Sequence, residues 1–247
     1  MVKGIERFRE YFIDYSDQYV LIGGTACDIS FGNHNSDFRT TRDLDVVLIV
    51  EALTPEFGQR FWEFIRDGGY QNRAKSTGTP QFYRFDKPTE EGFPMMIELF
   101  ARSEYILEKD GGLTPIHLDD SIPSLSAILL NEAYYQALLQ GREMVNGFSI
   151  LKPNWLIPFK AKAWLDLNAR RKCGEHVDSQ DLKKHKNDII RIAAEFLLDR
   201  CELPNEVRDD MAEFIESVSI SDQEIKNLKV HGVKAEDIRQ ILIDTYL

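Results

Sequence analysis

Apolar residues follow two different spacings along this chain, and the spacing changes near residues 150–154. Before the change, short apolar runs that suit buried strands alternate with stretches of helical periodicity, and after it the periodicity is helical throughout. In the first part, we predict strands at 19–22, 43–50, 81–85, 95–100, 115–118 and 126–130, and helices at 4–15, 25–31, 55–67 and 131–140. In the second part, we predict helices at 155–171, 180–199, 205–218, 221–228 and 234–246.

This pattern predicts an α+β fold in two domains, with a mixed sheet flanked by helices over residues 1–150 and a helical domain over residues 151–247. The dipeptide Asn146-Gly147 stands between apolar flanks and predicts a hairpin turn just before the boundary.

Composition narrows the class of protein. No apolar run approaches the roughly 18 residues of a membrane span, and the charged start lacks the apolar centre of a signal peptide. The three cysteines, Cys27, Cys173 and Cys201, are scattered without metal-ligand spacing. We therefore expect a cytoplasmic protein with no membrane partner and no zinc site.

The net charge of −11 argues against a chain that coats itself in nucleic acid. The charge is uneven, however, because residues 160–191 hold nine Lys/Arg and five Asp/Glu, a net +4 against −15 elsewhere. Such a basic segment suits phosphate binding. A solvated helix face is the alternative.

Two carboxylates open the clearest predicted strand. Side chains alternate along a strand, so Asp43 and Asp45 project together while Leu44 and Val46 face the core. Such a pair suits Mg²⁺ or Mn²⁺ bound together with substrate phosphates. The alternative is that the two aspartates are solvent-exposed residues at the start of a strand and bind no metal.

A glycine turn precedes these carboxylates. Gly23 and Gly24 end an apolar run, and their backbone N–H groups at a helix start suit a phosphate, to which Thr25 adds a hydroxyl. Arg39 and Thr41 stand before the acids in an R-x-T-x-D-L-D phrase. A further acid, Glu98, lies inside the apolar strand MMIELF, where a charge needs a partner or a metal, so we predict it as a third metal ligand.

The joint pattern of strand, Gly-Gly-Thr, helix and R-x-T-x-D-x-D resembles the polymerase-β-like nucleotidyltransferase superfamily. The long gap between Gly24 and Asp43, together with Arg39 and Thr41, looks more like its AbiEii/AbiGii abortive-infection toxin branch. The resemblance implies a nucleotidyltransferase-like fold that transfers NMP from an NTP with magnesium. It also implies a toxin of a toxin–antitoxin pair, with tRNA as acceptor and a cognate antitoxin as partner.

The resemblance extends into the second half, where Lys160 and Asp188 match positions of that branch, although His185 departs from its acid. It implies that Lys160 offsets phosphate charge and that Asp188 acts as a base or positions the attacking hydroxyl. A surface lysine, and an i,i+4 ion pair between Lys184 and Asp188, are the structural alternatives. Lys162 lies about 200° around the helix from Lys160, so the two cannot face one site.

The sequence therefore predicts a metal-dependent nucleotidyltransferase with a helical region closing over the nucleotide. Small-molecule modification, of the antibiotic type, is the alternative acceptor chemistry. A non-catalytic module that binds a nucleotide or a partner is the alternative from another class.

Overall fold

The computed structural model describes residues 2–34, 38–39, 41–75, 81–101, 128 and 131–247. The chain forms two compact units, which we call the sheet unit (Met1–Leu130 with Arg142–Lys152) and the helical unit (Asn131–Gly141 with Pro153–Leu247).

The sheet unit is built on a seven-stranded mixed sheet with the order β3-β4-β5-β2-β1-β7-β6. Strands β2 and β5 pair in parallel, as do β1 and β7, and the other neighbours are antiparallel. The strands are β1 Tyr19–Leu21, β2 Asp43–Leu48, β3 Asn72–Lys75, β4 Gln81–Asp86, β5 Met96–Ala101, β6 Arg142–Val145 and β7 Phe148–Leu151.

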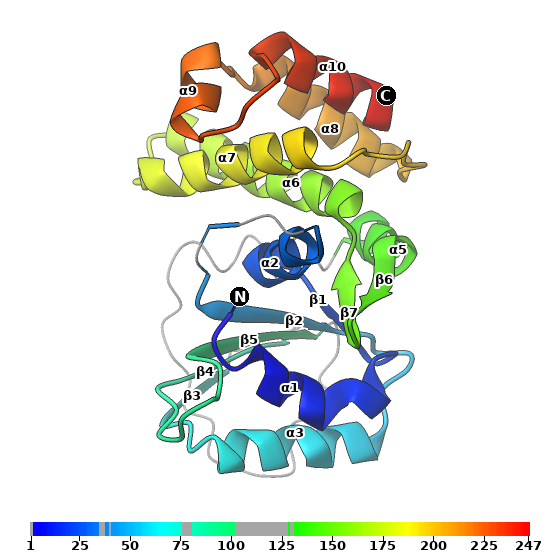
Figure 1. The fold of residues 1–247 in the computed structure, drawn as a ribbon, viewed down its shortest axis with the longest axis vertical. Coiled ribbons are helices and arrows are strands. Elements are labelled where there is room, and N and C mark those ends of the chain that lie inside the picture. The colour runs from blue at the N-terminus through cyan, green and yellow to red at the C-terminus, as the bar shows by residue number, and fades with distance from the viewer. Residues whose placement is uncertain (1, 35–37, 40, 76–80, 102–127, 129–130) are drawn as a thin grey trace. The chain divides into compact units, whose positions relative to one another are not determined.

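Helices cover both faces of this sheet (Figure 1). On one side lie α1 (Ile5–Phe12), extended by a 3-10 turn at Ile13–Tyr15, and α3 (Pro55–Asp67), while α2 (Gly23–Asn33) lies on the other. The unit is therefore a sheet between two helical layers, and α2 connects β1 to β2.

An aromatic cluster fills the space between α1, α3 and the sheet. Phe64 is fully buried, with its ring centroid 5.8 Å from Phe8, 5.5 Å from Phe12 and 5.0 Å from Phe93. Offset and edge-to-face ring pairs of this kind stabilise a core beyond their buried area. The apolar face of residues 55–67 that the sequence predicts is therefore the packing face of α3.

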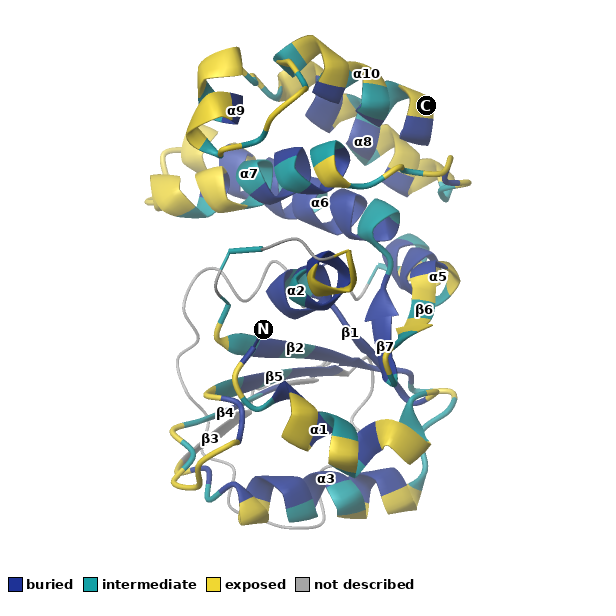
Figure 2. Cartoon of the chain, viewed as in Figure 1, coloured by how far each residue is buried: buried dark blue, intermediate teal, exposed yellow. Residues whose placement is uncertain are grey.

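The helical unit holds six helices, and their inward faces are buried (Figure 2). They are α5 Glu132–Gly141, α6 Pro153–Lys172, α7 Ser179–Glu195, α8 Asn205–Ser217, α9 Asp222–Asn227 and α10 Ala235–Tyr246. The chain enters this unit twice, because α5 belongs to it although β6 and β7 follow α5 in the sequence.

The α+β class and the helix-flanked mixed sheet agree with the sequence prediction, and the Asn146-Gly147 hairpin is confirmed between β6 and β7. Both turn residues have positive φ, 53° and 83°, as the turn requires. Prediction missed β3 and placed 131–140 with the sheet domain. The predicted strand at 115–118 lies outside the described residues. So does 126–130, except for Ile128, which is helical.

Among the described residues, no helix combines the length and the apolar character that crossing a membrane would need.

We expect Phe64→Ala to lower the free energy of unfolding by about 3–5 kcal/mol, because it leaves a cavity in the aromatic cluster. Urea unfolding followed by circular dichroism measures this. Gln59, exposed on the same helix, supplies the control substitution Gln59→Ala. A loss below about 1 kcal/mol for Phe64→Ala would contradict a well-packed cluster.

Candidate nucleotide and metal site

Strand β2 presents its two carboxylates on one face. Leu44 and Val46 are buried in the core, at 0% and 1% exposure, while Asp43 and Asp45 are half-exposed. The alternation that the sequence predicts is thus present. In the parallel pairing with β5, Asp45 lies beside Glu98, so all three acids belong to the same face of the sheet.

The start of α2 approaches the side chain of Asp45 closely. Gly23 is the first residue of the helix, with φ of 64°, and a Cβ built on it would lie 2.1 Å from Oδ2 of Asp45. The backbone N–H of Ile22 donates to the carbonyl of Asp45 at 3.0 Å, which holds the end of β1 against β2. The glycine turn and the carboxylate strand are therefore one local structure.

Gly24 brings the segment before β2 to the same place. A Cβ on Gly24 would lie 2.7 Å from Oγ1 of Thr41 and 3.5 Å from Nη2 of Arg39. Gly23 thus lies beside Asp45 and Gly24 beside Arg39 and Thr41, so four of the five predicted nucleotide-binding residues lie at the start of α2. Because these four residues are up to 18 positions apart in the sequence, the α2 connection is what brings them together.

Thr25 has a different geometry from the one predicted. Its side chain is fully buried, and its hydroxyl donates to the backbone carbonyl of Asp43 at 2.7 Å. A hydroxyl engaged in this way holds α2 on β2. We therefore assign Thr25 to positioning the carboxylate strand, in place of direct phosphate contact.

Glu98 has a partner on β4. Both Nε and Nη2 of Arg84 donate to its Oε1, at 3.0 and 2.7 Å, and the two side chains are 21% and 13% exposed for Arg84 and Glu98. This charge-assisted pair explains how an acid is tolerated in an apolar strand. Sequence reasoning missed Arg84, although a second charge within the apolar phrase FYRF was the signal for it.

The carboxylates of β2 suit a hard cation. They number two and not three, because Glu98 on β5 is paired with Arg84. Asp43 and Asp45 offer oxygen ligands of the kind that magnesium prefers. Within the described ranges, no group of three His, Cys, Asp or Glu side chains is arranged to hold a metal ion. The residues therefore fit a magnesium ion bound by the two aspartates, with further oxygen ligands supplied by a substrate.

The helical unit joins the two site residues predicted in the second half. Nζ of Lys160 on α6 donates to Oδ2 of Asp188 on α7 at 2.8 Å, and the side chains are 7% and 1% exposed. Lys160 is buried, so the alternative of a surface lysine is wrong. The partner that the structure gives Asp188 is Lys160, and not Lys184 one helical turn before it. An ion pair this buried costs desolvation energy and stabilises only while both partners are present.

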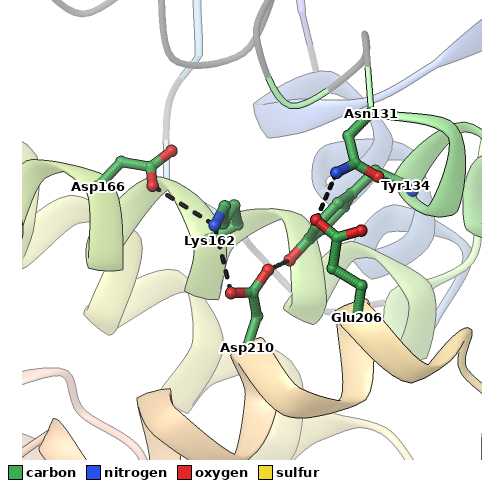
Figure 3. Close-up of polar contacts among 6 residues, drawn as sticks. All are labelled: Asn131, Tyr134, Lys162, Asp166, Glu206 and Asp210. Atoms are coloured by element: carbon green, nitrogen blue, oxygen red, sulfur yellow. Dashed lines mark hydrogen bonds and ion pairs between the residues drawn. The ribbon is translucent and has the colours of Figure 1, made fainter.

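Lys162 faces other partners, as the helical geometry predicts (Figure 3). Its ammonium lies 3.2 Å from Asp210 and 3.7 Å from Asp166, and the hydroxyl of Tyr134 donates to Asp210 at 2.8 Å. Burial lowers the pKa of Lys162, whereas the nearby carboxylates of Asp210 and Asp166 raise it. The net shift of the Lys162 pKa is upward. Burial raises the pKa of Asp166 despite Lys162, and burial with Asp210 raises that of Tyr134.

This cluster holds α5 in the helical unit. Tyr134 is fully buried on α5, and Asn131, just before α5, donates to Glu206 at the start of α8. The side-chain oxygen of Asn131 also accepts from the backbone N–H of Ala133 at 2.8 Å. Polar contacts to α6 and α8 thus account for a helix that the sequence alone placed with the sheet.

We expect Gly23→Ala to weaken binding of magnesium and NTP roughly 10- to 100-fold, because the new methyl group displaces the Asp45 carboxylate. Calorimetric titration of NTP with and without magnesium measures this.

Gly92→Ala is the matched control, since Gly92 also has positive φ, 83°, but has open space around its Cβ position. Both variants carry the backbone cost of about 1–2 kcal/mol. Only the Gly23 variant is expected to lose the ligand. Equal binding by the two variants would refute the proposed approach to Asp45.

We expect Asp188→Ala to lower the free energy of unfolding by about 3–5 kcal/mol, because it removes the carboxylate that pairs with the buried Lys160 ammonium. The apolar double variant Lys160→Met/Asp188→Leu should regain most of that loss. Urea unfolding of the full chain distinguishes these outcomes. If the double variant were as unstable as the single one, loss of the ion pair to a buried charge would not be the cause.

No protein-family model matches the sequence, and a search of curated proteins finds no match. Among solved structures, the crystal structure of JHP933 from Helicobacter pylori is similar at 12% identity, over 98% of this chain and 86% of that chain, with a TM-score of 0.35. At that TM-score the similarity carries no argument about fold or function.

Proposed function

We propose that this protein is a magnesium-dependent nucleotidyltransferase that moves NMP from an NTP to an acceptor hydroxyl. One observation carries the proposal, namely that the glycine-opened helix α2 meets the carboxylates of β2 at Gly23 and Asp45. A phosphate-binding helix start and a pair of metal-binding acids are the two parts that phosphoryl transfer requires. The resemblance of the Gly-Gly and D-x-D phrases to the polymerase-β-like superfamily supports the same assignment.

The residues around the turn have distinct tasks in this proposal. The backbone N–H groups at Gly23 and Gly24, at the positive end of α2, bind the triphosphate. Arg39, beside Gly24, adds a cationic donor, and Thr41 adds a hydroxyl. Thr25 holds this helix start on β2 through the Asp43 carbonyl.

Asp43 and Asp45 would hold the metal. Magnesium, when bound, supplies charge neutralisation on the phosphates and favours ionisation of the attacking hydroxyl. Arg84 keeps the Glu98 carboxylate engaged, so Glu98 borders the site as an ion-paired neighbour. We propose Glu98 as a metal ligand only if substrate binding draws Arg84 onto a phosphate.

The reaction forms one bond and breaks one. The oxygen of the acceptor hydroxyl bonds to the α-phosphorus, and the bond from that phosphorus to the oxygen bridging toward the β-phosphorus breaks. Pyrophosphate leaves with the bonding electron pair, and the hydroxyl proton passes to a base or to water. The roles of Lys160 and Asp188 toward phosphate and proton stay predictions from the resemblance, as do the toxin activity and the antitoxin.

Two alternatives stay distinguishable. A small-molecule acceptor would leave the carboxylates and the glycine turn unchanged but would direct label away from RNA. A non-catalytic nucleotide-binding module is favoured by one observation, the engagement of Glu98 by Arg84, which leaves two acids for the metal. Such a module would bind NTP and release no pyrophosphate toward any acceptor.

We expect Asp43→Asn/Asp45→Asn to reduce nucleotidyl transfer by about a thousandfold, because the loss of metal-bound charge removes several kcal/mol of transition-state stabilisation. Pyrophosphate release and label transfer from each α-labelled NTP, with magnesium and total cellular tRNA, measure this.

Asp14→Asn/Asp17→Asn is the control, because it makes the same change of charge at exposed positions of the same unit. Transfer that vanishes only in the Asp43/Asp45 variant would support the proposal. Metal-dependent turnover that persists unchanged in that variant would refute it.

A further inference from the structure

Two aromatic rings connect the later part of α2 to the guanidinium of Arg39. The ring of Phe31, 3% exposed on α2, lies 4.9 Å from the ring of Phe38, centroid to centroid, at an interplanar angle of 46°. The guanidinium carbon of Arg39 lies 5.3 Å from the centroid of the Phe38 ring. Phe38 is absent from the site that the sequence predicts, so this stack brings a further residue to it.

Helical periodicity puts both ends of this contact on one stripe of α2. Phe31 follows Gly24 by seven residues, which is about 20° short of two full turns and a rise of about 10.5 Å. The segment before β2 meets this stripe at both places, Phe38 at Phe31 and Arg39 with Thr41 at Gly24. Three residues of chain reach about 10 Å, so a segment anchored on Phe31 has the length needed to reach Gly24.

The stack holds a side chain that is otherwise flexible. A guanidinium above an aromatic face is attracted by the negative charge density of the ring, and its flat shape suits stacking. A long arginine side chain loses rotamer entropy when a ligand orders it. A ring that is itself anchored on a buried ring orders Arg39 before the ligand binds, which lowers that entropy cost.

Burial of apolar area is the simpler explanation for Phe38. The residue stays half-exposed, however, and a leucine at position 38 would also cover Phe31 with apolar atoms. Leucine has no aromatic face for the Arg39 guanidinium. The two explanations therefore predict different results for substitutions at this position.

We propose that Phe38 is a positioning residue that holds the Arg39 guanidinium beside Gly24 for a polyphosphate ligand. The proposal rests on the proposed function, since it assumes that phosphates bind at the glycine turn, but binding is measurable without turnover. Charge-assisted hydrogen bonds from a guanidinium to phosphate oxygens depend on geometry, so a fixed guanidinium should bind more tightly than a mobile one.

The test compares Phe38→Leu and Phe38→Tyr with the wild-type full chain, by calorimetric titration of inorganic tripolyphosphate with and without magnesium. Phe38→Leu should weaken binding roughly 3- to 30-fold, the range expected for loss of a cation–ring attraction. Phe38→Tyr keeps the ring and should bind within about twofold of wild type. Circular dichroism and thermal melting check that the variants are folded.

A double-mutant cycle with Arg39→Ala separates positioning from packing. If Phe38 acts through Arg39, then Phe38→Leu should cause no further loss of affinity in the Arg39→Ala background. A packing role would weaken binding by the same factor in both backgrounds and would overturn the proposal. Phe38→Leu that binds like wild type, or Phe38→Tyr that binds as weakly as Phe38→Leu, would also overturn it.

Tyr11→Leu is the matched control, because Tyr11 is another half-buried ring under an arginine in the same unit. The guanidinium carbon of Arg60 lies 4.2 Å from its centroid. This pair belongs to α1 and α3, on the other side of the sheet from α2 (Figure 1). The control should bind tripolyphosphate like wild type, and a control that loses as much affinity as Phe38→Leu would count against the proposal.

The two proposals fail separately. Tripolyphosphate binding that depends on Phe38 and Arg39, with no nucleotidyl transfer, would reject the enzyme and keep the positioning role. Transfer that requires Asp43 and Asp45, with tripolyphosphate binding unaffected by Phe38→Leu, would reject the positioning role and keep the enzyme. Wild-type protein that binds no tripolyphosphate would also reject the positioning role.

Discussion

The sheet unit depends on one close contact, the approach of the α2 N-terminus to the carboxylate of Asp45. A Cβ at position 23 would lie 2.1 Å from Oδ2 of Asp45, so a side chain there would displace the Asp45 carboxylate. Two hydrogen bonds hold α2 and β2 together around this contact. The backbone N–H of Ile22 and the hydroxyl of Thr25 both donate to backbone carbonyls of β2. The glycine backbone at the start of α2 therefore lies directly beside one of the two acids of β2.

The charged side chains of the two units have different kinds of partners. In the sheet unit, Glu98 is neutralised by Arg84 across neighbouring strands, whereas Asp43 and Asp45 stay half-exposed on the next strand. In the helical unit, buried or half-buried ion pairs connect α6 to α7 and α8. Pairs of this kind stabilise the packing of these helices only while both partners are present.

The α5 helix shows that a segment can be recognised as a helix from its pattern while its place among the compact units is not. Its periodicity predicts a helix at residues 131–140, and a helix is there. The helical unit includes α5 because Tyr134 and Asn131 form side-chain hydrogen bonds there. Their partners, Asp210 and Glu206, lie more than 70 residues later in the sequence. No local pattern encodes a partner at that distance, because side-chain hydrogen bonding is satisfied only after the helices pack.

The sequence by itself determined most of the elements and the alternation of faces along β2, since both follow from the period of apolar residues and from turn chemistry at Asn146-Gly147. It also determined that Asp43 and Asp45 share a face. Only the tertiary structure decided what each charged group meets: Arg84 for Glu98, Lys160 for Asp188, and the Asp43 carbonyl for the Thr25 hydroxyl. The physical reason is range, because periodicity is a property of neighbouring residues, whereas partners are set by the register of strands and the packing of helices distant in the chain.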